Sequence, residues 1–157
     1  MTKKPLSTEP LFNLQVTLKP PHDIGTSYAG RRLIFDIDCG TFEGDRLKGT
    51  LIPSGGDWLV RHPDGSFTLD VRICLKTDDD ALIYMAYKGR WVMSPEVAAK
   101  VLNPATCTEI DKDDYYQRNL IMFETSSDKY RWLNDIVAIS QGERTPVGIN
   151  YYVSEVC

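Results

Sequence analysis

The stretch from Ser66 to Thr77 constrains the fold most, because apolar and polar residues alternate along its whole length. The apolar members are Phe67, Leu69, Val71, Ile73 and Leu75. A period of two places such residues on one face of a β-strand. The acidic run at 78–80 then predicts a turn, and residues 81–88 are expected to return as the hairpin partner. The sequence therefore predicts a long antiparallel hairpin with one apolar face.

Similar stretches recur along the chain, separated by turn residues. Strands are expected over 11–19, 31–41, 42–53, 58–61, 115–125, 133–140 and 147–156. The segments 20–30, 54–57 and 141–144 are rich in glycine, proline or polar residues and are expected to be loops. One short helix is expected over 96–102, with Ser94 as its N-cap and Pro95 in its first turn.

This order of elements predicts an all-β fold with eight to ten strands and one short helix. Evenly spaced strands with turn residues between them are typical of a sandwich or a barrel. A closed antiparallel up-and-down β-barrel is favoured over the sandwich, because the strands follow one another as hairpins and closure leaves no exposed edge. A barrel of about eight strands holds side chains or one small ligand inside.

The chain length of 157 residues predicts a single domain over residues 1–157, with residues 1–10 as a flexible N-terminal arm. The net charge of −4 makes nucleic acid an unexpected partner. The four cysteines form no metal-binding spacing and are expected to be reduced thiols. Neither a signal peptide nor a long apolar span is visible, so the expected location is the cytoplasm, away from the membrane.

Motifs that bind common cofactors are absent from the sequence. It contains neither a glycine-rich dinucleotide loop nor a phosphate-binding loop, and it has only two histidines, His22 and His62. The acidic run at 78–80 lacks the glycine and glutamate of a calcium-binding loop. We therefore expect the protein to work without a cofactor or metal.

A set of short phrases in fixed order resembles a known family. The phrases are Gly40–Gly44 (GTFEG), Leu47–Gly49 (LKG), Gly55–Trp58 (GGDW), Thr77–Asp79 (TDD) with Ala81–Tyr84 (ALIY), Phe123–Thr125 (FET), Tyr130–Asn134 (YRWLN) and Gly142–Arg144 (GER). The resemblance covers roughly residues 10–156, nearly the whole chain. The chain resembles a family of small bacterial and fungal proteins catalogued as domain of unknown function three-two-three-seven. The resemblance implies an antiparallel β-barrel, often oligomeric, and it implies little about chemistry. At Asp80 this sequence departs from the family, which usually has a glycine closing that turn.

Three residues are candidates for proton transfer. Asp57 lies beside Trp58, and a carboxylate next to a large ring can have a raised pKa and act as a general acid or base; alternatively, it caps the preceding turn. Glu124 lies within a strand, where it either pairs with a cation such as Arg72 or does chemistry. Tyr84 either donates a proton or packs within its strand.

The other candidates would bind the substrate. They are Trp58, Arg72, Tyr116, Arg118, Trp132 and Asn134. Arginines would hold an acidic or carbonyl group, and Asn134 either bonds a ligand or ties a loop. These roles depend on which face of the strands lines the interior. Either the apolar face lines the interior and the polar face is exposed, or the polar face lines a wide cavity and the apolar face is covered from outside. The resemblance to the family favours the second arrangement.

These observations leave three functions open. The favoured one is a cofactor-independent lyase, isomerase or hydratase that acts on a small aromatic or carbonyl-bearing molecule. The second is a barrel that binds a small ligand without turnover, and the third is a purely structural subunit. If the outer face of the barrel is apolar, a homodimer or a higher homo-oligomer is expected to cover it.

Overall fold

The alternating stretch forms the predicted strand and its hairpin partner. In the computed structural model, which describes residues 4–157, β5 covers Phe67–Thr77 and β6 covers Leu82–Val92. The two strands pair antiparallel from Phe67 opposite Trp91 to Lys76 opposite Leu82. The turn between them places Asp80 at a φ of 67°, a left-handed conformation that favours glycine.

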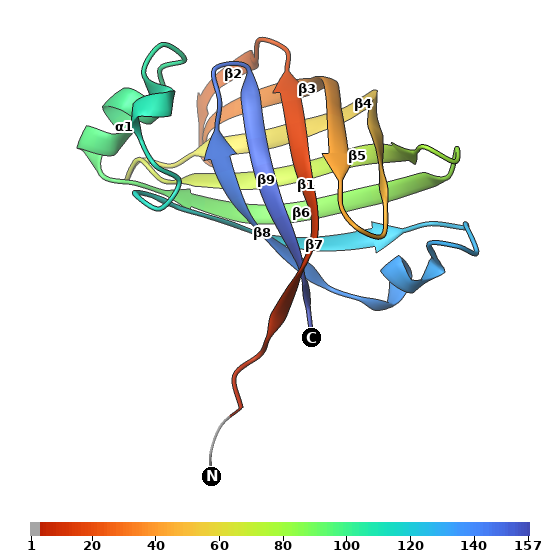
Figure 1. Ribbon diagram of the computed structural model, residues 1–157. Coiled ribbons are helices and arrows are strands. Elements are labelled where there is room, and N and C mark those ends of the chain that lie inside the picture. Colours follow the sequence, from red (N-terminus) through yellow and green to blue (C-terminus); the bar gives the residue numbers. More distant parts are fainter. Residues whose placement is uncertain (1–3) are drawn as a thin grey trace.

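Eight strands close into an antiparallel barrel, as predicted (Figure 1). Their order is β1-β9-β8-β7-β6-β5-β4-β3, and pairing of β1 with β3 completes the circle. The remaining strand, β2, pairs only with β3 and stands outside the circle. The other strands are β1 (Thr8–Leu18), β2 (His22–Ser27), β3 (Gly30–Glu43), β4 (Lys48–Arg61), β7 (Tyr116–Glu124), β8 (Ala138–Arg144) and β9 (Gly148–Val156).

Short helices lie at the two ends of the barrel. Helix α1 (Pro95–Val101) follows β6, and Ser94 caps it by accepting the backbone N–H of Val97 at 3.3 Å, so the predicted helix is confirmed. The turn η1 (Cys107–Glu109) follows α1, and η2 (Arg131–Asp135) joins β7 to β8 at the other end (Figure 1). The described part of the chain contains no helix long and apolar enough to cross a membrane.

Three segments that were expected to be loops contain strands. Strand β2 and the start of β3 lie within residues 20–30, and residues 54–57 belong to the continuous strand β4. Residues 141–144 end β8, so the turn to β9 comes later. Of the predicted arm, residues 1–3 lie outside the described part, and Thr8–Pro10 already pair with β9. Glycine and proline are typical of breaks between strands, but here pairing within the barrel supplies partners for the backbone, which sequence alone does not show.

The interior of the barrel is lined by the apolar face of each strand. On β5, Phe67, Val71 and Leu75 are buried, whereas Arg72 and Lys76 are exposed. The expectation that the polar face lines the interior is therefore wrong. An eight-stranded barrel is only wide enough for side chains or one small ligand, so polar residues from all strands could not be hydrated inside it.

One end of the barrel is filled by aromatic side chains. The ring of Phe12 on β1 packs edge-on against Phe42 of β3 and Phe123 of β7, with centroids 5.6 and 6.1 Å apart. Leu133 of η2 is completely buried and belongs to the same hydrophobic core. This closed end gives the barrel a packed core, and it leaves the opposite end for a cavity.

Candidate functional site

A cavity of about 690 Å³ occupies the open end of the barrel. Its walls come from β1, β3, β4, β5, β6, β7, β8 and β9, and the segment after α1 adds Leu102 and Pro104 at the rim. Most of the wall is apolar and includes Val16, Leu59 and Phe67. This volume lies in the range of sites for small organic molecules.

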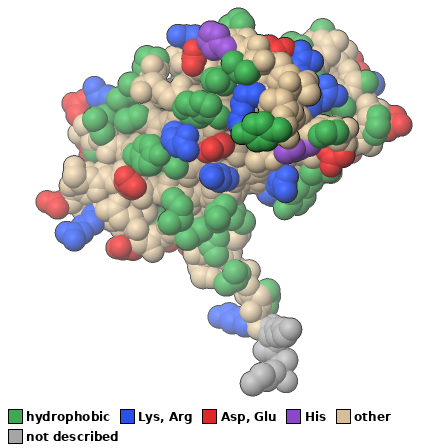
Figure 2. All heavy atoms as spheres, turned by 180° about the vertical axis from the view of Figure 1, so that it is seen from behind, with side chains coloured by type: hydrophobic (Ala, Val, Ile, Leu, Met, Phe, Trp, Pro, Cys, Tyr) green, Lys and Arg blue, Asp and Glu red, His purple; other side chains and the backbone are tan. Residues whose placement is uncertain are grey.

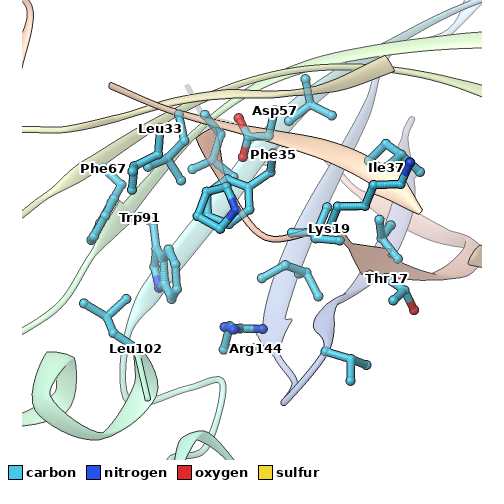
Figure 3. A pocket seen from close by; sticks show the side chains of 18 of the residues that line it. Thr17, Lys19, Leu33, Phe35, Ile37, Asp57, Phe67, Trp91, Leu102 and Arg144 are labelled. Atoms are coloured by element: carbon cyan, nitrogen blue, oxygen red, sulfur yellow. The ribbon is translucent and has the colours of Figure 1, made fainter. Parts of the chain in front are cut away.

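Asp57 is a buried carboxylate in this apolar wall. Figure 3 shows it among Phe35, Leu33 and the other side chains around the cavity. Its Oδ1 accepts the backbone N–H of Asp70 at 3.2 Å, and the side chain is 7% exposed. Burial raises the pKa of Asp57 to about 7, and the nearby charge of Asp70 also acts in that direction. Asp57 therefore exchanges a proton near neutral pH.

Asp57 points inward because it lies on the same face of β4 as the buried Leu51 and Leu59, an even number of residues away, and the Gly55–Gly56 pair accommodates the irregularity before it. Strand β4 has two extra residues between the pairs Ile52 opposite Cys74 and Gly55 opposite Ile73. Gly55 has a φ of +93°, and a Cβ there would lie 2.0 Å from a backbone oxygen of β5, so only glycine fits. The irregularity restores the pairing before Asp57 and keeps its side chain on the interior face.

Two tyrosines lie near Asp57 inside the barrel. Tyr87 of β6 and Tyr151 of β9 are buried, and their rings meet edge-on with centroids 5.4 Å apart. Burial raises the pKa of both hydroxyls above the usual value, and the negative charge of Asp57 adds to the effect. Both therefore remain hydrogen-bond donors at neutral pH.

Cationic side chains surround the mouth. Lys19, Arg31, Arg61 and Arg144 all border the cavity, and Arg144 faces it from the side opposite Asp57 (Figure 3). The guanidinium of Arg144 donates to the carbonyl oxygen of Gly148 at 2.6 Å, and burial lowers its pKa. Arg31 is paired with Asp23, but the other three cations outnumber Asp57, the sole carboxylate among the described lining residues, so the field at the mouth favours an electron-rich or anionic ligand.

Two further polar groups of the cavity have no partner within residues 4–157. Gln117 of β7 is completely buried with both amide atoms unbonded, and the indole nitrogen of Trp91 on β6 is also unbonded. Buried polar groups are nearly always hydrogen-bonded in native proteins. This pair is therefore an unusual feature of the wall.

Of the residues predicted for the site, Asp57 alone lines the cavity. Trp58 and Arg72 lie on the outside of the barrel, where the guanidinium stands 5.3 Å from the ring centroid and contacts Asp70 at 3.4 Å. Tyr116 and Arg118 form a similar outer pair at 5.2 Å. Trp58 and Arg72 contact each other across neighbouring strands, whereas Tyr116 and Arg118 contact each other along one strand, and none of the four lines the cavity.

The structure brings Tyr84, Glu124 and Asn134 together in a shallow depression on the outer surface. Tyr84 and Glu124 are opposite each other on β6 and β7. Asn134 accepts the backbone N–H of Thr125 at 2.8 Å and donates to its carbonyl at 3.0 Å, so its amide ties the loop. Trp132 lies under the guanidinium of Arg46, 3.8 Å from the ring centroid. All four predicted residues, Tyr84, Glu124, Trp132 and Asn134, therefore lie outside the barrel cavity.

Sequence reasoning missed Tyr87, Tyr151, Gln117, Trp91 and Arg144. Gln117 could have been identified from the alternation along β7. It lies four residues before the buried Ile121 and therefore on the same, apolar face of the strand. Within the described residues, no group of three histidine, cysteine or acidic side chains is placed to hold a metal ion.

Solved structures and relatives share the fold. A β-barrel-like protein from Acinetobacter baumannii is 36% identical, with a TM-score of 0.83 and coverage of 99% of both chains. A UPF0311 protein of Clostridium acetobutylicum is 29% identical over 147 residues, which are 93% of this chain and 91% of the relative. The hydroalkoxylation enzyme phnH of Penicillium herquei is 27% identical over 135 residues, or 85% of this chain and 72% of the enzyme.

A family model also matches nearly the whole chain. It covers residues 6–156 and is described as "Protein of unknown function (DUF3237)", in agreement with the resemblance of the short phrases. The chain therefore belongs to the DUF3237 family.

Proposed function

We propose that this protein is an enzyme that transfers a proton on a small organic molecule inside the barrel, with Asp57 as the acid–base group. The observation that carries the proposal is a buried carboxylate with a pKa of about 7 in the wall of a 690 Å³ cavity. A general acid or base is most effective when its pKa lies near the working pH. The apolar wall supplies the desolvation that gives Asp57 this pKa.

The reaction class that fits is addition of an O–H group across a carbon–carbon double bond, or its reversal. A relative named as a hydroalkoxylation enzyme supports this class, which falls among the lyase, isomerase and hydratase chemistry expected from the sequence. Asp57 takes the hydroxyl proton while the oxygen bonds to the carbon remote from a conjugated carbonyl. The protonated Asp57 then returns this proton to the carbon of the enolate next to the carbonyl, so atoms and charge balance without an added cofactor.

The remaining polar groups suit the charge that develops in this reaction. The hydroxyls of Tyr87 and Tyr151 stay protonated and can donate to an enolate oxygen. Arg144 and Lys19 at the mouth favour the entry of an electron-rich ligand. The proposed ligand is therefore a small aromatic or carbonyl-bearing molecule with an ionisable hydroxyl.

An ortho-hydroxychalcone tests the proposal, because its phenol closes onto the enone to give a chiral flavanone. The wild-type protein is expected to give one enantiomer in excess, whereas Asp57→Asn gives racemic product about a thousandfold more slowly than the enzyme. Absorbance follows the rate, and chiral chromatography measures the enantiomeric excess, which the uncatalysed background lacks.

Glu124→Gln is the matched control. It removes a carboxylate from the outer depression and leaves the cavity intact, so rate and enantiomeric excess should equal those of the wild type. Retention of the full rate and excess in Asp57→Asn would show that Asp57 moves no proton. If Glu124→Gln alone lost activity, the reaction would instead take place in the outer depression.

A second candidate function is binding without turnover. The mostly apolar wall of the cavity favours it, because such a wall suits a carrier or sensor of a small molecule. In that case the chalcone would bind to both the wild type and Asp57→Asn, and the flavanone would be racemic with each. The same measurement therefore separates the two functions.

The expected homo-oligomer has a candidate surface on β7 and β8. Leu120 and Met122 are 56% and 51% exposed, and Ile139 stands opposite Leu120 on the outer face. Figure 2 shows exposed hydrophobic side chains among charged groups on the face seen from behind. We propose that a second copy covers these residues, because contiguous exposed apolar side chains mark interaction surfaces.

The double substitution Leu120→Glu and Met122→Glu is expected to convert the assembly into monomers, because charges on the covered surface oppose burial. Size-exclusion chromatography with light scattering at micromolar concentration measures the mass. Ile24→Glu on β2, which is also exposed, is the control that keeps the assembly intact. A monomeric wild-type protein under the same conditions would contradict this surface.

A further inference from the structure

Gln117 is a buried amide that the protein does not satisfy. Its side chain is completely buried and lines the cavity, and neither Oε1 nor Nε2 has a partner among residues 4–157. Asn119, two residues along the same face of β7, donates from Nδ2 to the Ser140 hydroxyl at 2.9 Å. Its Oδ1 has no partner among the described residues, so the barrel satisfies one atom of this amide and neither atom of the Gln117 amide, which borders the cavity. Because an unbonded buried amide destabilises a protein, its presence points to a partner that arrives from the cavity.

Trp91 adds a second unbonded donor next to Gln117. The two residues stand directly opposite each other on β6 and β7, and both line the cavity. The indole is held between Phe67, whose ring centroid lies 5.3 Å away, and Tyr115 at 5.8 Å. Its Nε1 is buried without a partner in the part of the chain that the structure describes. The two side chains thus place adjacent hydrogen-bonding groups in the wall, and because these atoms have almost no accessible surface, a ligand reaches them when the side chains turn toward the cavity.

Gly142 on β8 provides the space for the amide. A Cβ at this position would lie 2.2 Å from Oε1 and 2.4 Å from Cδ of Gln117. Any other residue here would displace the amide, so the glycine leaves the space that the Gln117 side chain occupies.

We propose that Gln117 and Trp91 bind the edge of a planar ring ligand that carries a carbonyl next to an N–H or O–H group. An amide offers one acceptor and two donors, and an indole offers one donor. Nε2 of Gln117 and Nε1 of Trp91 donate to the ligand carbonyl, while Oε1 of Gln117 accepts the neighbouring N–H or O–H. The inference rests on the proposed function only in taking the cavity as the ligand site, and it names the ligand class and the residues that select it.

Carbostyril, a bicyclic lactam, and N-methylcarbostyril test this pairing, because they differ only in the N–H that Gln117 would accept. Isothermal titration calorimetry is expected to show at least about tenfold tighter binding of carbostyril to the wild type. In Gln117→Met the preference should fall to within about twofold. Trp91→Phe should weaken both compounds about equally, because it removes a donor to the shared carbonyl.

Two further measurements control for folding. Gln117→Met should raise the Tm of the unliganded protein by about 3 °C, because it removes an unbonded buried amide at nearly constant volume. Gln141→Met, which removes an amide from the outer side of the adjacent strand, should leave the lactam preference unchanged.

The inference is overturned if the wild type does not distinguish the two compounds or binds neither, or if Gln117→Met keeps the preference. If Gln117→Met still prefers carbostyril over its N-methyl derivative, the lactam binds at a site that does not include Gln117. Because this binding measurement does not involve Asp57, its failure is separate from a failure of the proton-transfer proposal. A lactam preference that depends on Gln117 supports this inference even if Asp57→Asn retains turnover.

Discussion

Asp57→Asn is expected to increase the free energy of unfolding by about 4 kcal/mol at pH 8 and to leave it nearly unchanged at pH 4. The effect arises because the pKa of Asp57 is about 7 in the folded protein, whereas its ordinary value is 3.8. Between these two pH values the folded protein keeps a proton that the unfolded chain releases. Stability is therefore highest below pH 4 as far as this group is concerned, and it falls as the pH rises to about 7.

Asparagine removes this dependence without changing the size of the side chain. Its carbonyl oxygen can still accept the backbone N–H of Asp70, so the local bond is kept. Urea denaturation at a series of pH values measures the effect as the difference between the two proteins. Asp38→Asn, which removes an exposed carboxylate of β3, is the matched control. Its free energy of unfolding should depend on pH in the same way as that of the wild type. Equal pH dependence of Asp57→Asn and the wild type would show that burial does not raise the pKa of Asp57.

Leu75→Ala is expected to destabilise the protein by about 4 kcal/mol, roughly twice the effect of Leu69→Ala. Both leucines lie on the interior face of β5, and their exposed fractions are 0% and 2%. Leu75 lies toward the closed end of the barrel, away from the cavity wall, whereas Leu69 borders the cavity. Truncation at the closed end creates a new void, but truncation at the cavity enlarges one that already exists.

Urea denaturation at one pH measures this difference in the free energy of unfolding. The two substitutions remove the same atoms from the same strand, so each serves as the control for the other. The pair therefore reports the cost of a new void, separately from the loss of a buried leucine. Equal destabilisation would show that the open end is as tightly packed as the closed end in solution.

Much of the fold could be predicted from local sequence. The alternation in β5, the turn at 78–80 and the Ser94 cap of α1 each depend on neighbouring residues, and each was confirmed. Residues 54–57 were mistaken for a loop because Gly55 and Gly56 are typical of turns. In the barrel they form an irregularity inside a long strand, supported by pairing with β5. That pairing joins residues far apart in sequence, and no local pattern reveals it.

The candidate site was harder to predict for the same reason. Asp57 was chosen for its neighbour Trp58, but the two side chains are on opposite sides of the sheet. Its raised pKa comes from burial in a wall made by several strands. Glu124 and Tyr84 do lie together, but on the outer surface. Tyr87, Tyr151 and Gln117 resembled ordinary strand residues, since their burial depends on which face turns inward.

The sequence by itself determined that the chain forms antiparallel hairpins with one apolar face, because strand periodicity is a local property. Tertiary structure alone decided that this face lines the interior, that one end of the barrel is filled and that the other holds a cavity. Closure of eight strands leaves an interior too narrow to hydrate polar faces, so the apolar side chains turn inward. Polar residues at interior positions, with Asp57 and Gln117 foremost, then become the site because burial changes their chemistry.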